Sequence, residues 1–169
     1  MSPFPSRITD PDALIRALLM VPYLPGAGNW SGADCWGVNE LWYANQFGLL
    51  LNDRTGIAPG ADGLAEGFDD FEAHGWIEVA EPRDHDTIIM RHVAMAEIDG
   101  KPVRRVIEHG HCGIYWRGKV IHADGYLKTD EDGNEHWTGG VRVDDFDSPR
   151  IRGRVSAILR REELAQLAS

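Results

Sequence analysis

The sequence lacks the features that mark several large classes of protein. Its apolar runs all fall short of the about 18 residues that a membrane-spanning helix needs, so we expect no membrane insertion. Lysine and arginine number 17 against 27 aspartates and glutamates, and the formal net charge is −10. A net charge of this sign disfavours nonspecific binding to nucleic acid or to anionic membranes, so we expect neither partner.

Several common site signatures are also missing. The chain has no His-Glu-x-x-His motif and no Cys-x-x-Cys pair, which are frequent metal-ligand patterns. It has no P-loop, no Rossmann glycine pattern and no Gly-x-Ser-x-Gly elbow. We therefore expect neither a metal ion nor an organic cofactor. One alternative stays open, because His109 and His111 are close enough to share a metal that His122 could join.

Cysteine is scarce, with only Cys35 and Cys112 in the chain. The first residues lack the apolar core and cleavage site of a secretory signal, so we expect synthesis in a reducing cytoplasm. The two cysteines could form one disulfide in principle, but a reducing compartment favours free thiols.

The first part of the chain carries helical patterns. Residues 10–21 begin with an aspartate cap and a proline, and their apolar residues then repeat at helical spacing. Residues 34–49 keep a similar period behind a glycine-rich loop. After a turn-rich connector at residues 52–63, residues 64–71 predict a shorter helix closed by a glycine.

The rest of the chain has the pattern of strands and turns. We expect strands at residues 76–79, 87–90, 93–98, 103–107, 111–116, 119–123, 126–143 and 155–159, the longest of these interrupted by an acidic turn, and a short helix at 160–167. Helices followed by strands predict an α+β fold with an antiparallel sheet. At 169 residues, of which 43% are hydrophobic, the chain is expected to form one domain spanning residues 1–169.

Cys35 is the most informative residue, because it stands where the glycine-rich loop becomes a helix. Asp34 can cap that helix. Unpaired N–H groups and a partial positive charge at a helix N-terminus favour the thiolate over the thiol, as a nucleophile requires. The alternative is a small buried hydrophobe on the helix face, which is the commonest role of a free cysteine.

His111 is the candidate general base for this thiol. Strand alternation places His111 on one face with Gly113 and Tyr115, and turns Cys112 to the other face. The small Gly113 leaves room beside the imidazole for a substrate. His109 shares the face of His111 and is a rival candidate, and a purely structural histidine is the alternative for either.

His122 is the candidate third member, since it follows His111 by 11 residues on the next strand of a tight hairpin. It would orient the His111 ring and stabilise its cationic form. Asp124 could also serve as the orienting group. The alternative for His122 is a cross-strand polar pair without chemical use.

Three motifs in this order resemble the NlpC family of cell-wall cysteine peptidases. They read Asp-Cys-Trp-Gly at residues 34–37, His-Cys-Gly-Ile-Tyr at 111–115 and Gly-Lys-Val-Ile-His-Ala at 118–123. The resemblance covers roughly residues 10–159. Tryptophan in the first motif is typical of the branch found in the tail tips of bacteriophages and gene transfer agents, whereas bacterial wall enzymes carry serine there.

The resemblance implies a papain-like domain with the nucleophile at a helix start, packed on an antiparallel sheet. It makes Cys35 the nucleophile, His111 the base and His122 the orienting residue, without a cofactor. It also implies positions near the substrate, and at one of them this chain carries Trp36 where bacterial members carry serine. These positions are Tyr23, Asp34 and Trp36.

The function implied is hydrolysis of amide bonds in peptidoglycan stem peptides, often between D-glutamate and the diamino acid. The implied setting is a tail tip that docks on other tail proteins and acts at the host cell wall, after synthesis in the bacterial cytoplasm. Two alternatives remain: a catalytically silent tail-tip or assembly protein, and an intracellular amidase or acyltransferase on the same fold.

Overall fold

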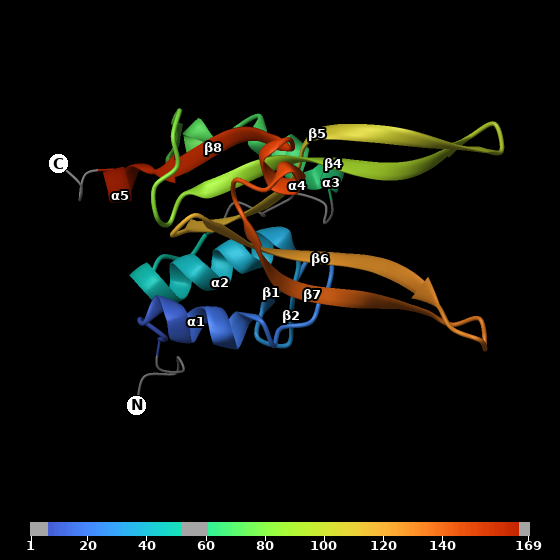
Figure 1. The fold of residues 1–169 in the computed structure, drawn as a ribbon, viewed down its shortest axis with the longest axis horizontal. Helices are drawn as coiled ribbons and strands as arrows, with labels where there is room; N and C mark the ends of the chain where they lie inside the picture. Colours follow the sequence, from blue (N-terminus) through green and yellow to red (C-terminus); the bar gives the residue numbers. More distant parts are fainter. Residues whose placement is uncertain (1–6, 52–60, 166–169) are drawn as a thin grey trace.

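The computed structural model describes residues 7–51 and 61–165 (Figure 1). Its helices are α1 (Pro11–Leu18), α2 (Cys35–Phe47), α3 (Ala61–Phe68), the 3-10 helix η1 (Glu72–His74), α4 (Pro149–Arg152) and α5 (Glu162–Ala165). Its strands are β1 (Gly28–Asn29), β2 (Gly32–Ala33), β3 (Trp76–Glu78), β4 (Thr87–Ile98), β5 (Lys101–Trp116), β6 (Lys119–Thr129), β7 (Glu135–Asp145) and β8 (Val155–Arg161).

The main sheet has six strands in the order β3-β8-β4-β5-β6-β7, and every pairing in it is antiparallel. The short strands β1 and β2 form a separate antiparallel pair in the loop before α2. The predicted α+β class with an antiparallel sheet is therefore confirmed. Within the described segments no helix has the length and apolar character needed to cross a bilayer.

The strands differ from the prediction in length. β4 and β5 are each one long strand where two shorter ones were predicted, because their cross-strand pairing runs through a register shift between Met90 and His92. The tight turn at Asp99 and Gly100, both with positive φ, joins them. The helix α4 was not predicted, and residues 52–60 of the predicted connector lie outside the described part of the chain.

The sheet divides between β5 and β6. These strands pair only over a short stretch, from Ile114 opposite Ile121 to Trp116 opposite Lys119. Beyond Ile114 and Ile121 the β4–β5 and β6–β7 hairpins separate, and Figure 1 shows them as two distinct arms. We call this point of separation the fork. Gly113 still lies against β6 at this point, since a Cβ on it would come within 2.7 Å of the Ile121 carbonyl oxygen.

The helix α2 packs on the sheet beside the fork. Its Val38 and Trp42 are fully buried in one core cluster with Ile114 and Ile121, the last residues paired before the fork. Burial of side chains of this size contributes roughly 1.5–3 kcal/mol each. The N-terminus of α2 is therefore held in a fixed position next to the fork.

Candidate active site

Cys35 is the first residue of α2, as the sequence predicts. The Asp34 carboxylate caps this helix by accepting a hydrogen bond from the Gly37 N–H at 2.8 Å. Its other oxygen accepts from the Gly26 N–H, also at 2.8 Å, and so fastens the preceding loop to the helix. Asp34 is buried, and these two bonds give its carboxylate a structural role.

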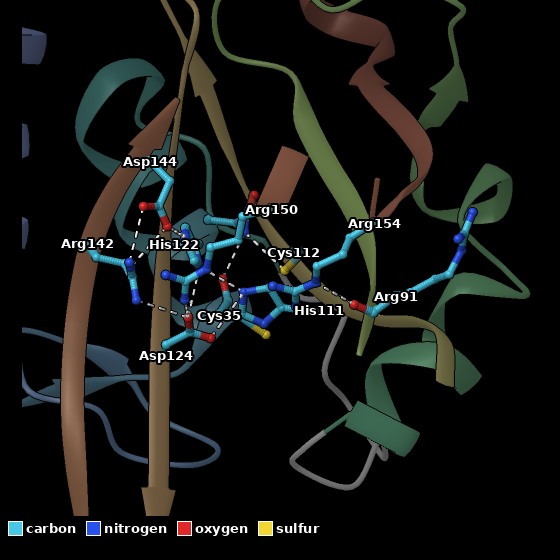
Figure 2. Close-up of polar contacts among 11 residues, drawn as sticks. Cys35, Arg91, His111, Cys112, His122, Asp124, Arg142, Asp144, Arg150 and Arg154 are labelled. Carbon is cyan, nitrogen blue, oxygen red and sulfur yellow. Dashed lines mark hydrogen bonds and ion pairs between the residues drawn. The ribbon is translucent and has the colours of Figure 1, made fainter. Parts of the chain in front are cut away.

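The Cys35 thiol is poised to ionise. Hydrogen bonding to Cys112 and then to His111, together with the charge on His111, holds the pKa of Cys35 well below its usual value. Burial of the thiol and the Asp34 carboxylate oppose this shift. Figure 2 shows the Cys35 sulfur beside the His111 ring. The environment thus favours a thiolate next to an imidazolium.

The two predicted histidines meet at the fork. His111 comes from β5 and His122 from β6, and His111 Nε2 lies 2.9 Å from His122 Nδ1. Both rings are buried and are nearly perpendicular, at 87°. The hydrogen bond between them occupies the place where strand pairing has stopped, so the fork positions the pair.

Asp144 extends this arrangement by one residue. His122 Nε2 lies 2.9 Å from Asp144 Oδ2, and two nitrogens of Arg142 hold the same carboxylate at 2.9 and 3.1 Å. Asp144 was missed in the sequence. The register of the β6–β7 hairpin could have found it, because His122 opposes Arg142 and Asp144 is two residues further along the same face.

These contacts define the tautomers of both rings. Ionised Asp144 can only accept, so His122 must donate its Nε2–H and keep Nδ1 as an acceptor. His122 Nδ1 then accepts from His111 Nε2–H. His111 Nδ1 is left as the nitrogen that can take the proton of Cys35. The order of the relay is therefore Cys35, His111, His122, Asp144.

His122 is suited to an orienting role rather than to carrying charge. Burial, and next the positive charge of His111, lowers the pKa of His122 to about 4, although Asp144 and Asp124 oppose the shift. A neutral His122 at neutral pH keeps its acceptor nitrogen turned to His111. His122 can therefore act by orienting the ring of His111, the residue next to the thiol.

Asp124 is a second carboxylate at the relay. One of its oxygens lies 3.7 Å from His111 Nε2, and the other lies 3.9 Å from His122 Nδ1. Burial would raise the pKa of Asp124, but His111, His122, Arg154 and Arg142 together lower it. Asp124 thus stays anionic beside the histidine pair, where it adds electrostatic support to the cationic ring.

The same three residues could hold a metal ion. The ligand atoms of His111, His122 and Asp124 all lie within 4.8 Å of one another. Two imidazoles and a carboxylate are ligands that zinc accepts, and Asp144 would support His122 from behind as a second carboxylate. Occupation by a cation would, however, replace the hydrogen bond between the two rings, so it competes with the relay.

The rival His109 is engaged elsewhere. Its Nδ1 lies 3.0 Å from the Ser156 hydroxyl, and its ring stacks on Phe68 at 3.8 Å between centroids. The ring of a further histidine, His92, lies 6.3 Å from that of His111. Burial, and then the charges of His111 and Arg154, lowers the pKa of His92, so it adds no competing cation.

The other positions implied by the resemblance lie in different surroundings. Trp36 is in the core, 9% exposed and in edge contact with Trp76, which leaves its ring little surface for a substrate. Tyr23 packs directly over Gly125, where a Cβ would come within 2.1 Å of the ring. Tyr23 therefore borders Asp124 at the open side of the fork.

A second residue missed in the sequence, Asn39, supports the thiol site from one turn along α2. Its amide donates to the Cys35 carbonyl at 2.9 Å and to Cys112 Sγ at 3.3 Å. Its carbonyl accepts from the Thr87 hydroxyl at 2.8 Å. Both cysteines are free, and Cys112 is fully buried between Asn39 and Cys35. Cys112 thus contacts the nucleophile, although alternation turns it away from His111.

We expect Cys35 to react with iodoacetamide at a pH below the range of an ordinary thiol. A free cysteine ionises near pH 8.5, whereas the contacts with Cys112 and His111 stabilise the Cys35 thiolate at lower pH. Peptide-level mass spectrometry after brief alkylation across pH 5–9 would measure this. His111→Ala should move the curve to higher pH. A wild-type curve centred near pH 8.5 would contradict an activated thiol.

Comparison with known proteins provides no independent assignment, because no family model and no curated protein matches this chain. The three motifs and the four side chains that connect Cys35 to Asp144 are therefore the features that point to a function.

Proposed function

We propose that this chain is a cysteine peptidase with a papain-like fold that hydrolyses amide bonds in peptidoglycan stem peptides. The observation that carries the proposal is the hydrogen-bonded series from His111 through His122 to Asp144, placed beside a thiol at a helix N-terminus. A nucleophile, a base and an orienting group in this order are the parts that acyl transfer to sulfur requires.

In the first half-reaction the Cys35 thiolate attacks the amide carbon, and a C–S bond forms. The main-chain N–H of Cys35 belongs to the first turn of α2, where N–H groups have no acceptor within the helix, so it can donate to the developing oxyanion. His111 then protonates the leaving nitrogen through Nδ1, the C–N bond breaks, and a thioester remains.

In the second half-reaction neutral His111 removes a proton from water, and the hydroxide attacks the thioester carbon. The C–S bond breaks, the carboxylic acid leaves and the Cys35 thiolate is restored next to protonated His111. His122 stays neutral in both halves, since its pKa is lowered to about 4, and Asp144 keeps its ring in the accepting tautomer. No metal or organic cofactor takes part in this scheme.

The proposed setting is the tail tip of a bacteriophage or of a related particle. It is supported by the Asp-Cys-Trp-Gly form of the nucleophile motif at residues 34–37. Mass spectrometry of purified particles should recover this chain together with other tail-tip proteins. Repeated failure to find it in assembled particles would count against the setting without affecting the chemistry.

The test of activity is mass spectrometry of muropeptides after incubation with the protein. We expect a new stem-peptide fragment that identifies the cleaved amide bond and that also forms in the presence of EDTA. Fragments that EDTA abolishes and that Cys35→Ala still produces would instead assign His111, His122 and Asp124 to a metal-dependent hydrolase.

Two further outcomes address the alternatives. A folded protein that cleaves no muropeptide, and whose Cys35 alkylates like an ordinary thiol, would favour a silent structural tail protein. A reactive Cys35 without muropeptide cleavage would favour an amidase or acyltransferase that acts on another substrate.

A further inference from the structure

A pocket opens beside the relay, on the β6–β7 arm of the fork. It has a volume of about 570 Å³ and is lined by β6, β7 and the start of α4. Its walls include Asp124, which lies 3.7 Å from His111 Nε2. A group bound in this pocket would therefore contact Asp124 and lie close to the histidine pair.

The pocket is locally cationic in a chain whose net charge is −10. Arg142 and Arg150 line it, and the charges of both act on Arg154. Burial, and then repulsion by Arg150 and Arg142, lowers the pKa of Arg154, although the two nearby carboxylates partly compensate. The charges of three guanidinium groups thus act near two carboxylates, those of Asp124 and Asp144, which leaves an excess of positive charge at this place.

Among the contacts of the described residues, the Arg150 guanidinium makes no two-nitrogen pair with a carboxylate. It contacts Asp124 through one nitrogen at 3.3 Å, which is longer than the about 2.7–2.9 Å of a charge-assisted hydrogen bond. By contrast, Arg160 holds buried Asp86 through two nitrogens at 2.8 and 2.6 Å. The side chain of Arg150 is also 51% exposed, so a ligand can reach it.

We propose that this pocket binds a carboxylate group of the substrate through Arg150, with Arg142 completing the cationic wall. The ligand class is an acidic peptide whose free carboxylate lies close to the scissile amide. A guanidinium fork matches the two oxygens of a carboxylate, whereas a neutral carboxamide satisfies only part of it. The inference rests on the proposed function and specifies which substrates the site selects.

The test compares two stem peptides that differ only by a free carboxylate or a carboxamide beside the scissile bond. Isothermal titration calorimetry with Cys35→Ala measures binding without turnover. We expect the acid to bind roughly 10–100-fold more tightly than the amide, which is the range for hydrogen bonds to charged groups. Arg150→Gln in the same background should remove this preference, and Arg150→Lys should restore part of it.

Arg152 provides a matched control on the same short helix. It pairs with Asp147 at 2.8 Å and lies over the Phe146 ring, so Arg152→Gln should leave the preference for the acid unchanged. Because acid and amide are compared within each variant, a general loss of peptide binding caused by the Arg150 substitutions cancels from the ratio. Thermal unfolding verifies that each variant is folded.

The outcomes separate this inference from the proposed function. Equal binding of the two peptides, binding of neither, or a preference that survives Arg150→Gln would overturn the carboxylate site. Cleavage of both peptides at equal rates would support the peptidase and reject the pocket. A strong preference in binding without any cleavage by the wild type would retain the pocket and reject the peptidase.

Discussion

Replacing Cys35 by alanine is expected to abolish turnover of muropeptides while the fold is retained. Loss of the nucleophile removes the covalent step, and in a serine peptidase the comparable change lowers kcat by a factor on the order of 10⁶. Cys35 is only partly buried and α2 is capped by Asp34, so removal of one sulfur should change the free energy of unfolding little. Initial rates and thermal unfolding of both proteins measure the two effects.

Cys112 supplies the matched control, because it is the other thiol and touches the first. Cys112→Ala should retain turnover but should shift the acid limb of the pH profile upward, since a contact that lowers the pKa of Cys35 is lost. Residual muropeptide cleavage by Cys35→Ala would refute the cysteine mechanism. Equal loss in both variants would indicate that the two thiols act together.

Replacing Asp144 by asparagine is expected to lower kcat strongly, although the two side chains have nearly the same shape. The carboxamide can donate an N–H to His122 Nε2, which would force His122 to donate from Nδ1 and would reverse both tautomers. His111 would then present an N–H to Cys35 instead of an acceptor. In a serine peptidase the comparable change lowers kcat about 10⁴-fold, and we expect a loss of roughly 10²–10⁴ here.

The comparison variants define what the relay does. His111→Ala should cost more than His122→Ala, because an orienting group is more replaceable than the base. Asp144→Ala should be milder than Asp144→Asn, because alanine imposes no tautomer. The neighbouring Asp145→Asn should be nearly neutral, since this exposed carboxylate pairs only with Lys119 among the contacts described. If Asp144→Asn and Asp145→Asn behave alike, the fourth member of the relay has no chemical role.

The sequence by itself determined the local features of this protein. The cap at Asp34 and the position of Cys35 at the helix start follow from residues within one turn, and the structure confirms both. The strand pattern likewise predicted an antiparallel sheet. Such features depend on backbone propensities and on neighbours in the chain, which a sequence displays directly.

Only the tertiary structure decided how the distant parts of the site meet. Asp144 joins His122 because the β6–β7 register brings residues 22 apart in the chain to hydrogen-bonding distance. The fork lies where β5 and β6 stop pairing, beyond Ile114 and Ile121. The pocket that Arg150 lines depends on helix α4, which the sequence did not predict. The place where pairing between two strands ends is set by packing over the whole sheet, so no local pattern reveals it.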